Sequence, residues 1–386
     1  MLSERLSETS PQRAGTNAGE GTPQRPNGER PIEKTPAAGP PGAASCPLPI
    51  TQVDEILLGH GSGGKLTSQL IEQVFLPAFR NPLLEALDDQ AIVSVNGSRL
   101  AFTTDSYVVT PIFFPGGDIG ELAVNGTIND LAVGGARPLW LSLACILEEG
   151  LPLADLQRVV DSARRAAERA GVQVVTGDTK VVGRGSGDKI FITTSGIGVV
   201  PPHVDVSSRH VRAGDAILLS GSIGDHGIAI LSQRQGIEFD GALESDTAAL
   251  HDLVAAMLRA SSRVHAMRDP TRGGLAATLV EIASRQHLGI EVDETTIPVR
   301  DTVRGACEIL GLDPLLVANE GKLVAFVADD VSECVLEAMR GHPLGRGACR
   351  IGRVTADHPG IVVLRTPVGG DRVLDLPFGE ALPRIC

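Results

Sequence analysis

The pattern of hydrophobic and polar positions changes near residue 50. The first 48 residues are rich in Pro, Gly, Ser, Thr, Glu and Arg and contain almost no large apolar side chains. A segment of this kind cannot bury enough apolar surface to offset the conformational entropy that it would lose on folding. We therefore expect residues 1–48 to form a disordered extension.

After Ile50, short apolar runs alternate with glycine-rich turns. Residues 100–104, 172–175 and 216–219 are runs of this kind and are typical of strands. Residues 153–170 instead place apolar side chains at helical spacing, and residues 119–133 form a second helical stretch. The alternation predicts a mixed α/β (α+β) fold.

The chain is long enough for about two globular domains. The adjacent prolines Pro201 and Pro202 follow an apolar run and indicate a domain boundary. We therefore expect an N-terminal α/β domain over 49–200, a C-terminal α/β domain over 201–376 and a mobile tail over 377–386.

Composition narrows the class of partner. The net charge of −13 and the pI near 5.2 argue against nucleic-acid and anionic-membrane surfaces. A polyanionic ligand would need local cations or a metal. The six cysteines are scattered without a CxxC pair, as expected for reduced intracellular thiols, and no apolar run is long enough to span a membrane. These features predict a soluble cytoplasmic protein.

Cys386 closes the sequence and is a candidate carrier of a reacting group. Pro377 and Pro383 favour extended conformations in the tail that precedes it. The seven residues after Gly379 could span roughly 23 Å at about 3.3 Å each, enough to reach a buried cleft. The alternative is an ordinary frayed terminus.

A glycine-rich segment, Gly59 to Leu66 (GHGSGGKL), comes close to a phosphate-binding loop. Leu66, however, stands where such a loop has the Ser or Thr that binds magnesium. The alternative is a flexible glycine loop that precedes a helix starting near Leu66.

Acidic residues at the predicted ends of strands and on a predicted helix could hold a magnesium nucleotide. They are Asp88, Asp89, Asp105, Asp130 and Asp178. Oxygen ligands of this kind, completed by water and phosphate, are those that magnesium prefers. Each residue taken alone is as readily a turn or helix cap.

Three loops in the second half could approach a ligand closely. They contain DPTRGG from Asp269, GDHG from Gly224 and NEGK from Asn319. Their glycines permit backbone contact with a ligand at a helix start, although turns and caps use the same residues. His226 in the second loop is expected to be a donor at a helix start, because no second His or Cys lies at ligand spacing.

Taken together, these motifs resemble the HypE family of hydrogenase maturation proteins. The resemblance runs from about Leu57 to Cys386 and rests on TTDS, the Asn129–Asp130 pair, GDTK, GSIGDHG, DPTRGG, NEG and the terminal PRIC. The family shares its ATP-binding fold with aminoimidazole ribonucleotide synthetase and selenophosphate synthetase. The resemblance implies two α/β domains and a homodimer in which N-terminal sheets pair, with ATP bound near that pairing.

The resemblance also implies a reaction. A carbamoyltransferase partner, HypF, would place a carbamoyl group on Cys386. ATP-dependent dehydration would convert this group into a thiocyanate. The cyanide would then pass to the iron of [NiFe]-hydrogenase through the scaffold partners HypC and HypD.

Site residues follow from the matching motifs. The resemblance implies that Mg²⁺ is held by Asp89, Asp105, Asp130 and Asp178, and that Asn129, Gly177 and Thr179 help to bind ATP. Lys180 and Glu320 are predicted to act on the carbamoyl group, Lys180 by neutralising developing charge and Glu320 by accepting an amide proton. Asp89 is preferred to Asp88 as the matching acidic position.

Two other functions compete with this one. Cys386 could be a docking tag on a scaffold for maturation partners, which would not consume ATP. The chain could also be a small-molecule kinase or synthetase of the same superfamily, which would remain active without Cys386. Loss of water from a carbamoylated tail would distinguish the first prediction from both.

Overall fold

The computed structural model describes residues 54–237, 243–379 and 384–386. The predicted extension 1–48 and residues 380–383 of the predicted tail lie outside the described residues. Residues 55–386 form one compact unit with two β-sheets. The mixed α/β class is confirmed.

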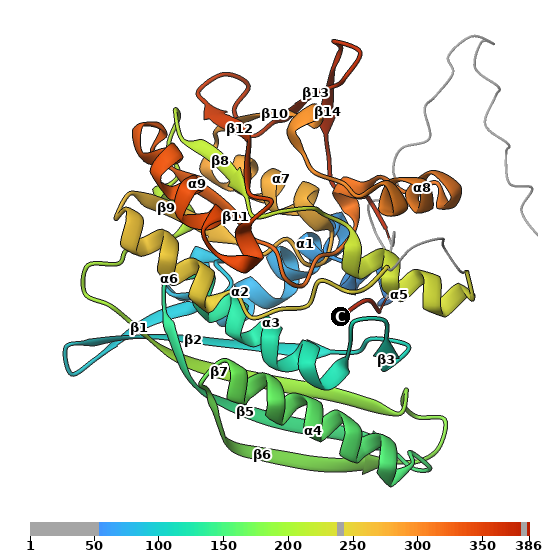
Figure 1. Ribbon diagram of the computed structural model, residues 1–386. Coiled ribbons are helices and arrows are strands. Elements are labelled where there is room, and N and C mark those ends of the chain that lie inside the picture. The colour runs from blue at the N-terminus through green and yellow to red at the C-terminus, as the bar shows by residue number, and fades with distance from the viewer. Residues whose placement is uncertain (1–53, 238–242, 380–383) are drawn as a thin grey trace, which may run out of the picture. The chain divides into compact units, whose positions relative to one another are not determined.

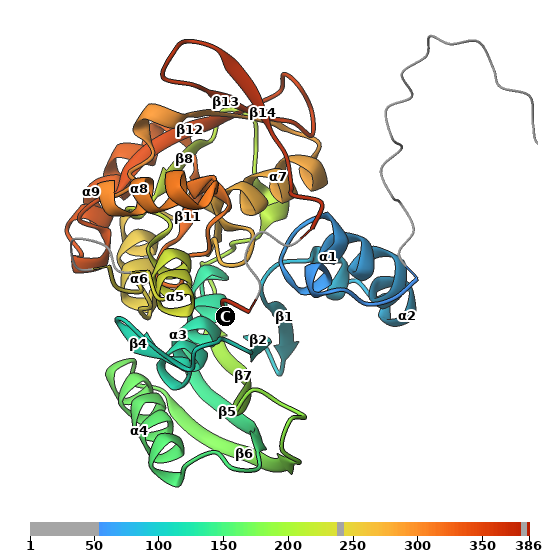
Figure 2. The same cartoon turned by 90° about the vertical axis from the view of Figure 1, so that its right-hand side faces the viewer.

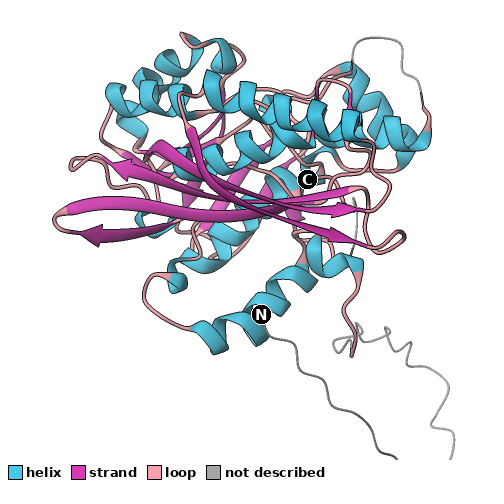
Figure 3. Cartoon of the chain, turned by 90° about the horizontal axis from the view of Figure 1, so that it is seen from below, coloured by secondary structure: helices cyan, strands magenta, loops and turns pink. Residues whose placement is uncertain are grey.

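The first sheet has five strands in the order β1-β2-β7-β5-β6. Neighbouring strands are antiparallel except for β5 and β6, which are parallel. Figure 3 shows the strands as a layer with helices along it. The strands are β1 (Ala91–Val95), β2 (Ser98–Tyr107), β5 (Arg137–Glu148), β6 (Gln173–Val182) and β7 (Ile190–Val200), and β3 (Phe113–Phe114) and β4 (Gly117–Asp118) form a small separate hairpin.

Helices α3 (Ile119–Val133) and α4 (Leu153–Arg169) lie beside the first sheet (Figure 1). Asp118 begins α3 as an N-cap, because its carboxylate accepts hydrogen bonds from the N–H groups of Gly120 and Glu121. Almost every residue of α3 is buried, since the helix packs against the sheet and also against α6 (His251–Ala260). This burial explains why apolar and small residues make up most of its sequence.

Strand β6 and part of the first sheet are exposed. Nine of the ten residues of β6 are exposed although the strand is rich in valine. Phe102 on β2 and Trp140 and Ile146 on β5 are also more than 40% exposed. An apolar edge strand and surface of this kind are typical of an interaction site.

The second sheet has seven strands in the order β14-β13-β10-β12-β8-β11-β9. Alternate residues of β8 (Ala216–Leu219) enter two different hydrophobic clusters: Ala216 and Leu218 pack with α6 and α9 (Ser332–Arg340), and Ile217 and Leu219 pack with α7 (Gly274–Gln286). Both faces of this sheet are therefore covered. The other strands are β9 (Val264–Arg268), β10 (Gly289–Asp293), β11 (Val324–Val327), β12 (Cys349–Thr355), β13 (Val362–Arg365) and β14 (Asp371–Leu374), and the remaining helices are α5 (Asp225–Gln235) and α8 (Asp301–Leu310).

The glycine-rich segment near residue 60 precedes a group of short helices. Figure 2 shows α1 (Lys65–Leu70) and α2 (Leu76–Phe79) next to each other, across the first sheet from α4. Gly63 has φ +78°, and a Cβ there would lie 2.6 Å from the carbonyl oxygen of Arg272. Glycine is therefore required for the close approach of these two loops. Single turns of other helix types are η1 (Leu58–Gly61), η2 (Ile71–Phe75), η3 (Leu84–Ala86), η4 (Ser208–His210), η5 (Glu294–Thr296), η6 (Pro314–Leu316), η7 (Asp329–Val331) and η8 (Pro343–Gly345).

The predicted elements match the structure closely. The helix predicted over 119–133 is α3, the one over 153–170 is α4, and the strand over 216–219 is β8. The run 100–104 lies inside β2, and the strand predicted from residue 172 begins at Gln173. Within the described residues, no helix is both long and apolar enough to cross a membrane.

Candidate active site

The last three residues lie inside the compact unit. The N–H groups of Val108 and Thr110 donate hydrogen bonds to the backbone oxygens of Cys386 and Arg384, at 3.1 and 3.3 Å. Ile385 is only 2% exposed and belongs to a hydrophobic cluster that Cys386 also contacts. Figures 1 and 2 mark this end of the chain close to α3 and α5.

The thiol of Cys386 is surrounded by ionisable groups. Burial raises its pKa far above the ordinary value, and the negative charge of Glu320 raises it further. The guanidinium of Arg272 opposes this shift and is the largest favourable influence on the thiolate. The thiol in this position is therefore protonated at neutral pH and is a poor nucleophile.

Glu320 is one of the most deeply buried acidic residues described, with 2% of its surface exposed. Its Oε1 atom has no hydrogen-bond partner. Burial raises the pKa of Glu320 well above its usual range, and the charges of Asp269, Asp105 and Asp246 raise it further. The carboxylate form of such a group is a stronger base than an ordinary carboxylate and is suited to accepting a proton during a reaction.

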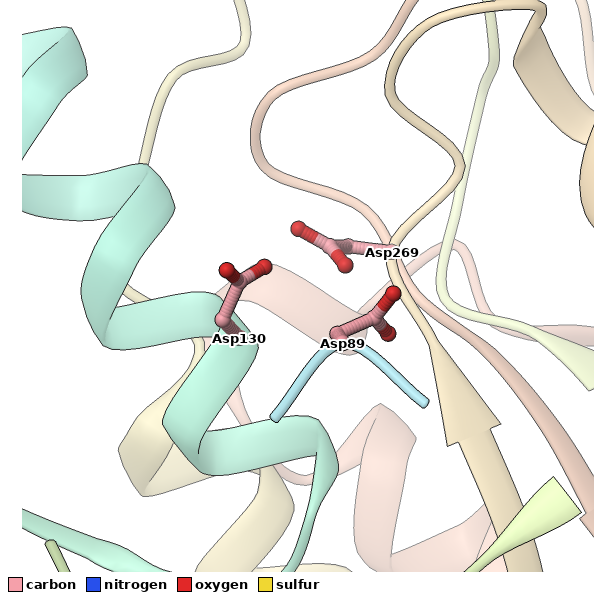
Figure 4. Close-up of side chains that lie close together, drawn as sticks. All are labelled: Asp89, Asp130 and Asp269. Atoms are coloured by element: carbon pink, nitrogen blue, oxygen red, sulfur yellow. The ribbon is translucent and has the colours of Figure 1, made fainter. Parts of the chain in front are cut away.

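Three carboxylates form a cluster near this region: Asp89, Asp130 and Asp269 each offer one oxygen, and these atoms lie within 4.8 Å of one another (Figure 4). Asp89 comes just before β1, Asp130 lies on α3, and Asp269 directly follows β9. Burial raises the pKa of Asp89 to about 6 and that of Asp269 to about 8, and their mutual repulsion adds to the shift of Asp269. Carboxylates brought together in this way favour a bound cation.

The members of this cluster are only partly paired. Arg268 forms an ion pair with Oδ1 of Asp89 at 2.8 Å, and Thr103 donates a hydrogen bond to Oδ2 of Asp130 at 2.8 Å. Oδ2 of Asp89 is buried and has no hydrogen-bond partner. Because a buried carboxylate oxygen without a partner is costly, this atom is a candidate ligand for a cation.

Asp88 has a different environment from Asp89. Its carboxylate accepts hydrogen bonds from the hydroxyl groups of Ser207 and Ser208 and from the N–H of Ser208. Asp88 therefore holds the turn η4, whereas Asp89 lies in the carboxylate cluster.

Asp105 lies on β2 between the cluster and the end of the chain. Its charge raises the pKa of Asp130 on one side and that of Cys386 on the other. Burial raises the pKa of Asp105 itself, and the nearby Arg272 lowers it. Asp105 and Arg272 thus connect the two parts of the site electrostatically.

Asn129 makes three hydrogen bonds with the backbone. Its Nδ2 donates to the carbonyl oxygens of Ala248 and Glu320, and its Oδ1 accepts from the N–H of Leu250. These contacts attach α3 to the segment before α6 and to the loop of Glu320. Asn129 therefore has a structural role in addition to lying close to the site.

The motif Gly177 to Lys180 is separate from this group. All four residues lie on the exposed strand β6, and Nζ of Lys180 pairs with Asp178 at 2.7 Å. The partners that lower the pKa of Asp178 are Lys180 and the N–H of Thr179. Gly177, Asp178 and Thr179 line a hollow of about 440 Å³ that also contains Cys145. The single chain thus brings Asp89, Asp105, Asp130 and Glu320 near one another and Cys386, but not Asp178 or Lys180.

The glycine-rich segment shows no similar relation to the carboxylates. Lys65 forms an ion pair with Asp375 at 2.5 Å, and its backbone N–H donates to the carbonyl oxygen of Pro377. The segment thus precedes α1 and holds the chain that leads into the tail.

Three residues of the site were not assigned to it by sequence reasoning. Asp269 and Arg272 belong to the DPTRGG motif, and His226 belongs to the GDHG loop. Both motifs stand out in the sequence, but turn and cap chemistry explains them equally well. Only the fold shows that Asp269 joins the cluster and that Nε2 of His226 lies 2.9 Å from the carbonyl oxygen of Ile385.

Comparison with known proteins shows which family the chain belongs to. Residues 87–200 match the N-terminal domain of AIR synthase related proteins, and residues 212–365 match the C-terminal domain. A carbamoyl dehydratase HypE from Cupriavidus necator is 56% identical over 330 residues, which are 85% of this chain and 94% of that protein. The chain belongs to the HypE family. The HypE of Escherichia coli K12 is 49% identical, and the match covers 86% of this chain and the whole of that protein.

Solved structures of HypE proteins have a fold similar to that of this chain. A crystal structure of a HypE–HypF complex is similar with a TM-score of 0.76 at 46% identity, covering 80% of this chain and 99% of the matched chain. A HypE in complex with ATP is similar with a TM-score of 0.73 at 50% identity, covering 86% of this chain and the whole matched chain. The two-sheet architecture is thus that of known HypE proteins.

Proposed function

We propose that this protein is an ATP-dependent carbamoyl dehydratase that acts on its own Cys386. The S-carbamoyl group would become a thiocyanate, which supplies cyanide ligands to the iron of [NiFe]-hydrogenase during maturation. The observation that carries this proposal is the position of Cys386. Its thiol lies in the interior, within the electrostatic reach of Glu320, Arg272 and Asp105.

The proposed reaction balances without an oxidant or reductant. The carbamoyl oxygen attacks the γ-phosphorus of ATP, and ADP leaves. The nitrogen loses both of its protons, one to a base and one that ends on phosphate, the C–O bond breaks, and inorganic phosphate departs as the C≡N bond forms. Phosphorylation is needed because an amide oxygen is otherwise a poor leaving group, and the step requires positioning and charge neutralisation above all.

Glu320 is the proposed base for the amide proton. It is buried, has an oxygen without a partner and has a raised pKa. The nearby Arg272 would stabilise negative charge that develops on the imidate. Glu320 lies in the loop before strand β11 of the second sheet, and Arg272 lies in the loop before helix α7, which packs on that sheet.

Asp89, Asp130 and Asp269 fit a magnesium ion, with Asp105 nearby. The fit rests on the partnerless Oδ2 of Asp89 and on the close approach of three buried carboxylates. Bound there, Mg²⁺ would neutralise charge on the phosphates of ATP. These four residues would position the nucleotide, with Asn129 holding the surrounding backbone.

A homodimer is proposed to add the motif Gly177 to Lys180 to the active site. Strand β6 is exposed along nine of its ten residues, and Trp140 and Phe102 lie exposed on the same sheet. A second copy that covers this surface would bury the strand that contains Gly177, Asp178, Thr179 and Lys180. Lys180 would then neutralise phosphate charge at a site completed by two chains, and Asp178 would contribute to the metal site.

The proposed partners are the proteins that would deliver the carbamoyl group and receive the cyanide made from it. HypF would donate the carbamoyl group, in line with the similarity to a HypE–HypF complex. HypC and HypD would accept the cyanide with iron, and the work would take place in the cytoplasm. Cys386 would have to leave its buried position for both exchanges.

The test is the intact mass of protein with carbamoylated Cys386, before and after Mg-ATP. We expect a loss of about 18 Da, the elements of one water that pass to phosphate. The variant Cys386→Ala should show no change. ATP turnover without loss of mass would contradict the proposal and favour a small-molecule synthetase.

The role of Lys180 has its own test. Lys180→Ala should still bind Mg-ATP and accept the carbamoyl group but should dehydrate it at least about a hundredfold more slowly. Full-rate formation of thiocyanate by this variant would remove Lys180 from the mechanism. Sedimentation of the wild type at micromolar concentration would show whether the dimer exists.

A further inference from the structure

We infer that His226 is a positioning residue that holds Cys386 in place and, through Ser245, aligns it with Glu320. The chemical meaning of this inference rests on the proposed dehydratase activity. The structural part does not, because it concerns where the end of the chain is held and by which groups.

The end of the chain is held through the backbone oxygens of three successive residues. Those of Arg384 and Cys386 accept hydrogen bonds from the N–H groups of Thr110 and Val108. The carbonyl oxygen of Ile385 lies 2.9 Å from Nε2 of His226. Because the peptide between Ile385 and Cys386 is planar, this contact fixes the orientation of Cys386.

The hydrogen bonds define the protonation of His226. A carbonyl oxygen can only accept, so Nε2 must bear the proton. Nδ1 then accepts a hydrogen bond from the hydroxyl of Ser245 at 2.7 Å, and that hydroxyl oxygen accepts one from the N–H of Thr247 at 3.1 Å. Burial lowers the pKa of His226, in agreement with a neutral ring.

The ring of His226 is also fixed by packing. Phe114 meets it edge to face, with ring centroids 5.6 Å apart and an interplanar angle of 89°. The N–H of Ser245 donates to the carbonyl oxygen of Pro115 at 2.8 Å. The β3 hairpin therefore restrains both His226 and its hydrogen-bond partner.

The adjacent residue extends the connection to Glu320. Oδ1 of Asp246 accepts a hydrogen bond from the N–H of Glu320 at 3.0 Å, and Oδ2 pairs with Lys322 at 3.0 Å. Ser245 thus contacts the histidine that holds the end of the chain, and the next residue, Asp246, binds the backbone of Glu320.

A second contact from α5 supports this role. Arg234 donates from its guanidinium to the carbonyl oxygens of Thr110 and Arg384, at 2.8 and 2.7 Å. His226 and Arg234 both lie on α5 and contact successive residues of the chain end. One helix thus provides the side-chain contacts to the backbone of Arg384 and Ile385.

Alkylation of Cys386 in the full-length, ligand-free protein measures how firmly the chain end is held. We would follow iodoacetamide modification of the C-terminal peptide by mass spectrometry. His226→Phe and Ser245→Ala should raise the rate about tenfold, the effect of losing one buried hydrogen bond of about 1.4 kcal/mol. His226→Gln, whose Nε2 can still donate to the carbonyl group, should stay near the wild type. His210→Gln, at a partly exposed histidine beside Asp205, is the matched control.

The rate of the dehydration step tests separately whether His226 aligns Cys386 with Glu320. With carbamoylated protein and Mg-ATP, His226→Phe should slow single-turnover loss of water at least about tenfold without changing the ATP concentration for half-maximal rate, and His226→Gln should restore most of it. A role in stability alone would lower the melting temperature but leave both rates unchanged at temperatures where the variant is folded.

The following results would overturn the inference about His226. If His226→Phe does not fold, Ser245→Ala remains, and unchanged alkylation in that variant would overturn the inference. Wild-type rates in a folded His226→Phe would also overturn it, as would failure of His226→Gln to recover. If even the wild type loses no water, the proposed function fails, whereas the alkylation rates still decide whether His226 holds Cys386.

Discussion

Asp246 binds the backbone N–H of Glu320 with one carboxylate oxygen and the ammonium group of Lys322 with the other. The side chains of Asp246 and Lys322 are only 6% and 14% exposed. Gly321 lies between these two partners, and a Cβ there would lie 1.8 Å from the carbonyl oxygen of Asp246. The loop of Glu320 is therefore fixed by its backbone as well as by its side chains.

Removing this anchor should destabilise the protein. Asp246→Ala leaves the ammonium group of Lys322 buried without its partner, so we expect the free energy of unfolding to fall by about 3 kcal/mol. Urea titration followed by circular dichroism would measure the change. Asp330→Ala removes an exposed ion pair with Arg263 and should cost less than about 1 kcal/mol. Equal losses in the two variants would contradict the importance of the Asp246 contacts.

The carboxylate cluster predicts a pH dependence of ligand-free stability. The pKa values of Asp89 and Asp269 in the folded protein are about 6 and about 8, both above the ordinary value of 3.8. The folded state therefore binds more protons than the unfolded state between about pH 4 and pH 8, and this contribution to stability is lost as the pH rises. Melting temperatures measured from pH 5 to 8.5 should show this loss, and Asp269→Asn should reduce it.

Stabilisation by Mg-ATP should depend on pH in the opposite direction to the stability of the ligand-free protein. Deprotonated carboxylates bind a cation, so the increase in melting temperature caused by Mg-ATP should be larger at pH 8 than at pH 6. ATP with EDTA is the control for the nucleotide alone. A stabilisation that is independent of pH, or the same in Asp269→Asn, would show that this cluster does not hold the metal.

Gly177 should be required for the pairing of β5 and β6. A Cβ at this position would lie 2.2 Å from the carbonyl oxygen of Leu143, a backbone atom that cannot move away freely. Gly177→Ala should therefore cost about 2 kcal/mol and increase hydrogen exchange of the β6 amides. Gly183→Ala, where no atom lies within 4 Å of the added Cβ, should leave exchange unchanged.

Glu320→Gln should separate nucleotide binding from chemistry. The amide keeps the size of the side chain but cannot accept the proton, so dehydration should slow at least about a hundredfold while Mg-ATP binding is retained. Because the pKa of Glu320 is raised, the wild-type rate should increase toward alkaline pH. Mass spectrometry of quenched reactions over a pH series would test both points. A variant that keeps the wild-type pH profile would exclude Glu320 as the base.

Local patterns were sufficient to predict much of the fold. The helix α3 begins after the cap Asp118 and consists mostly of apolar and small residues, and the helix predicted over 119–133 has the same limits. The strand β8 was equally clear, because four buried apolar residues lie between glycine-containing turns. Periodicity and turn chemistry act over a few residues and are therefore visible in one sequence.

The site was predictable only where a motif had one chemical interpretation. Asp89, Asp105, Asp130 and Glu320 lie near one another, but Asp269 was missed because an Asp before Pro and Gly is also an ordinary turn residue. His226 was expected to act at a helix start, and its ring contacts a residue 159 positions away. Contacts of that kind depend on the arrangement of whole elements, which no local pattern specifies.

The burial of α3 limits which parts of the protein can move during a catalytic cycle. Residues of α3, the first sheet and the second sheet share one hydrophobic cluster that includes Leu131, Ala101 and Leu218. A rotation of one sheet against the other would open this cluster to water, at a cost that grows with the apolar area exposed. The end of the chain, by contrast, contributes one buried side chain, Ile385, to a different cluster. Release of Cys386 would therefore expose less apolar surface than any movement of α3, so we expect the segment that carries the substrate to move while the groups that would act on it keep fixed positions.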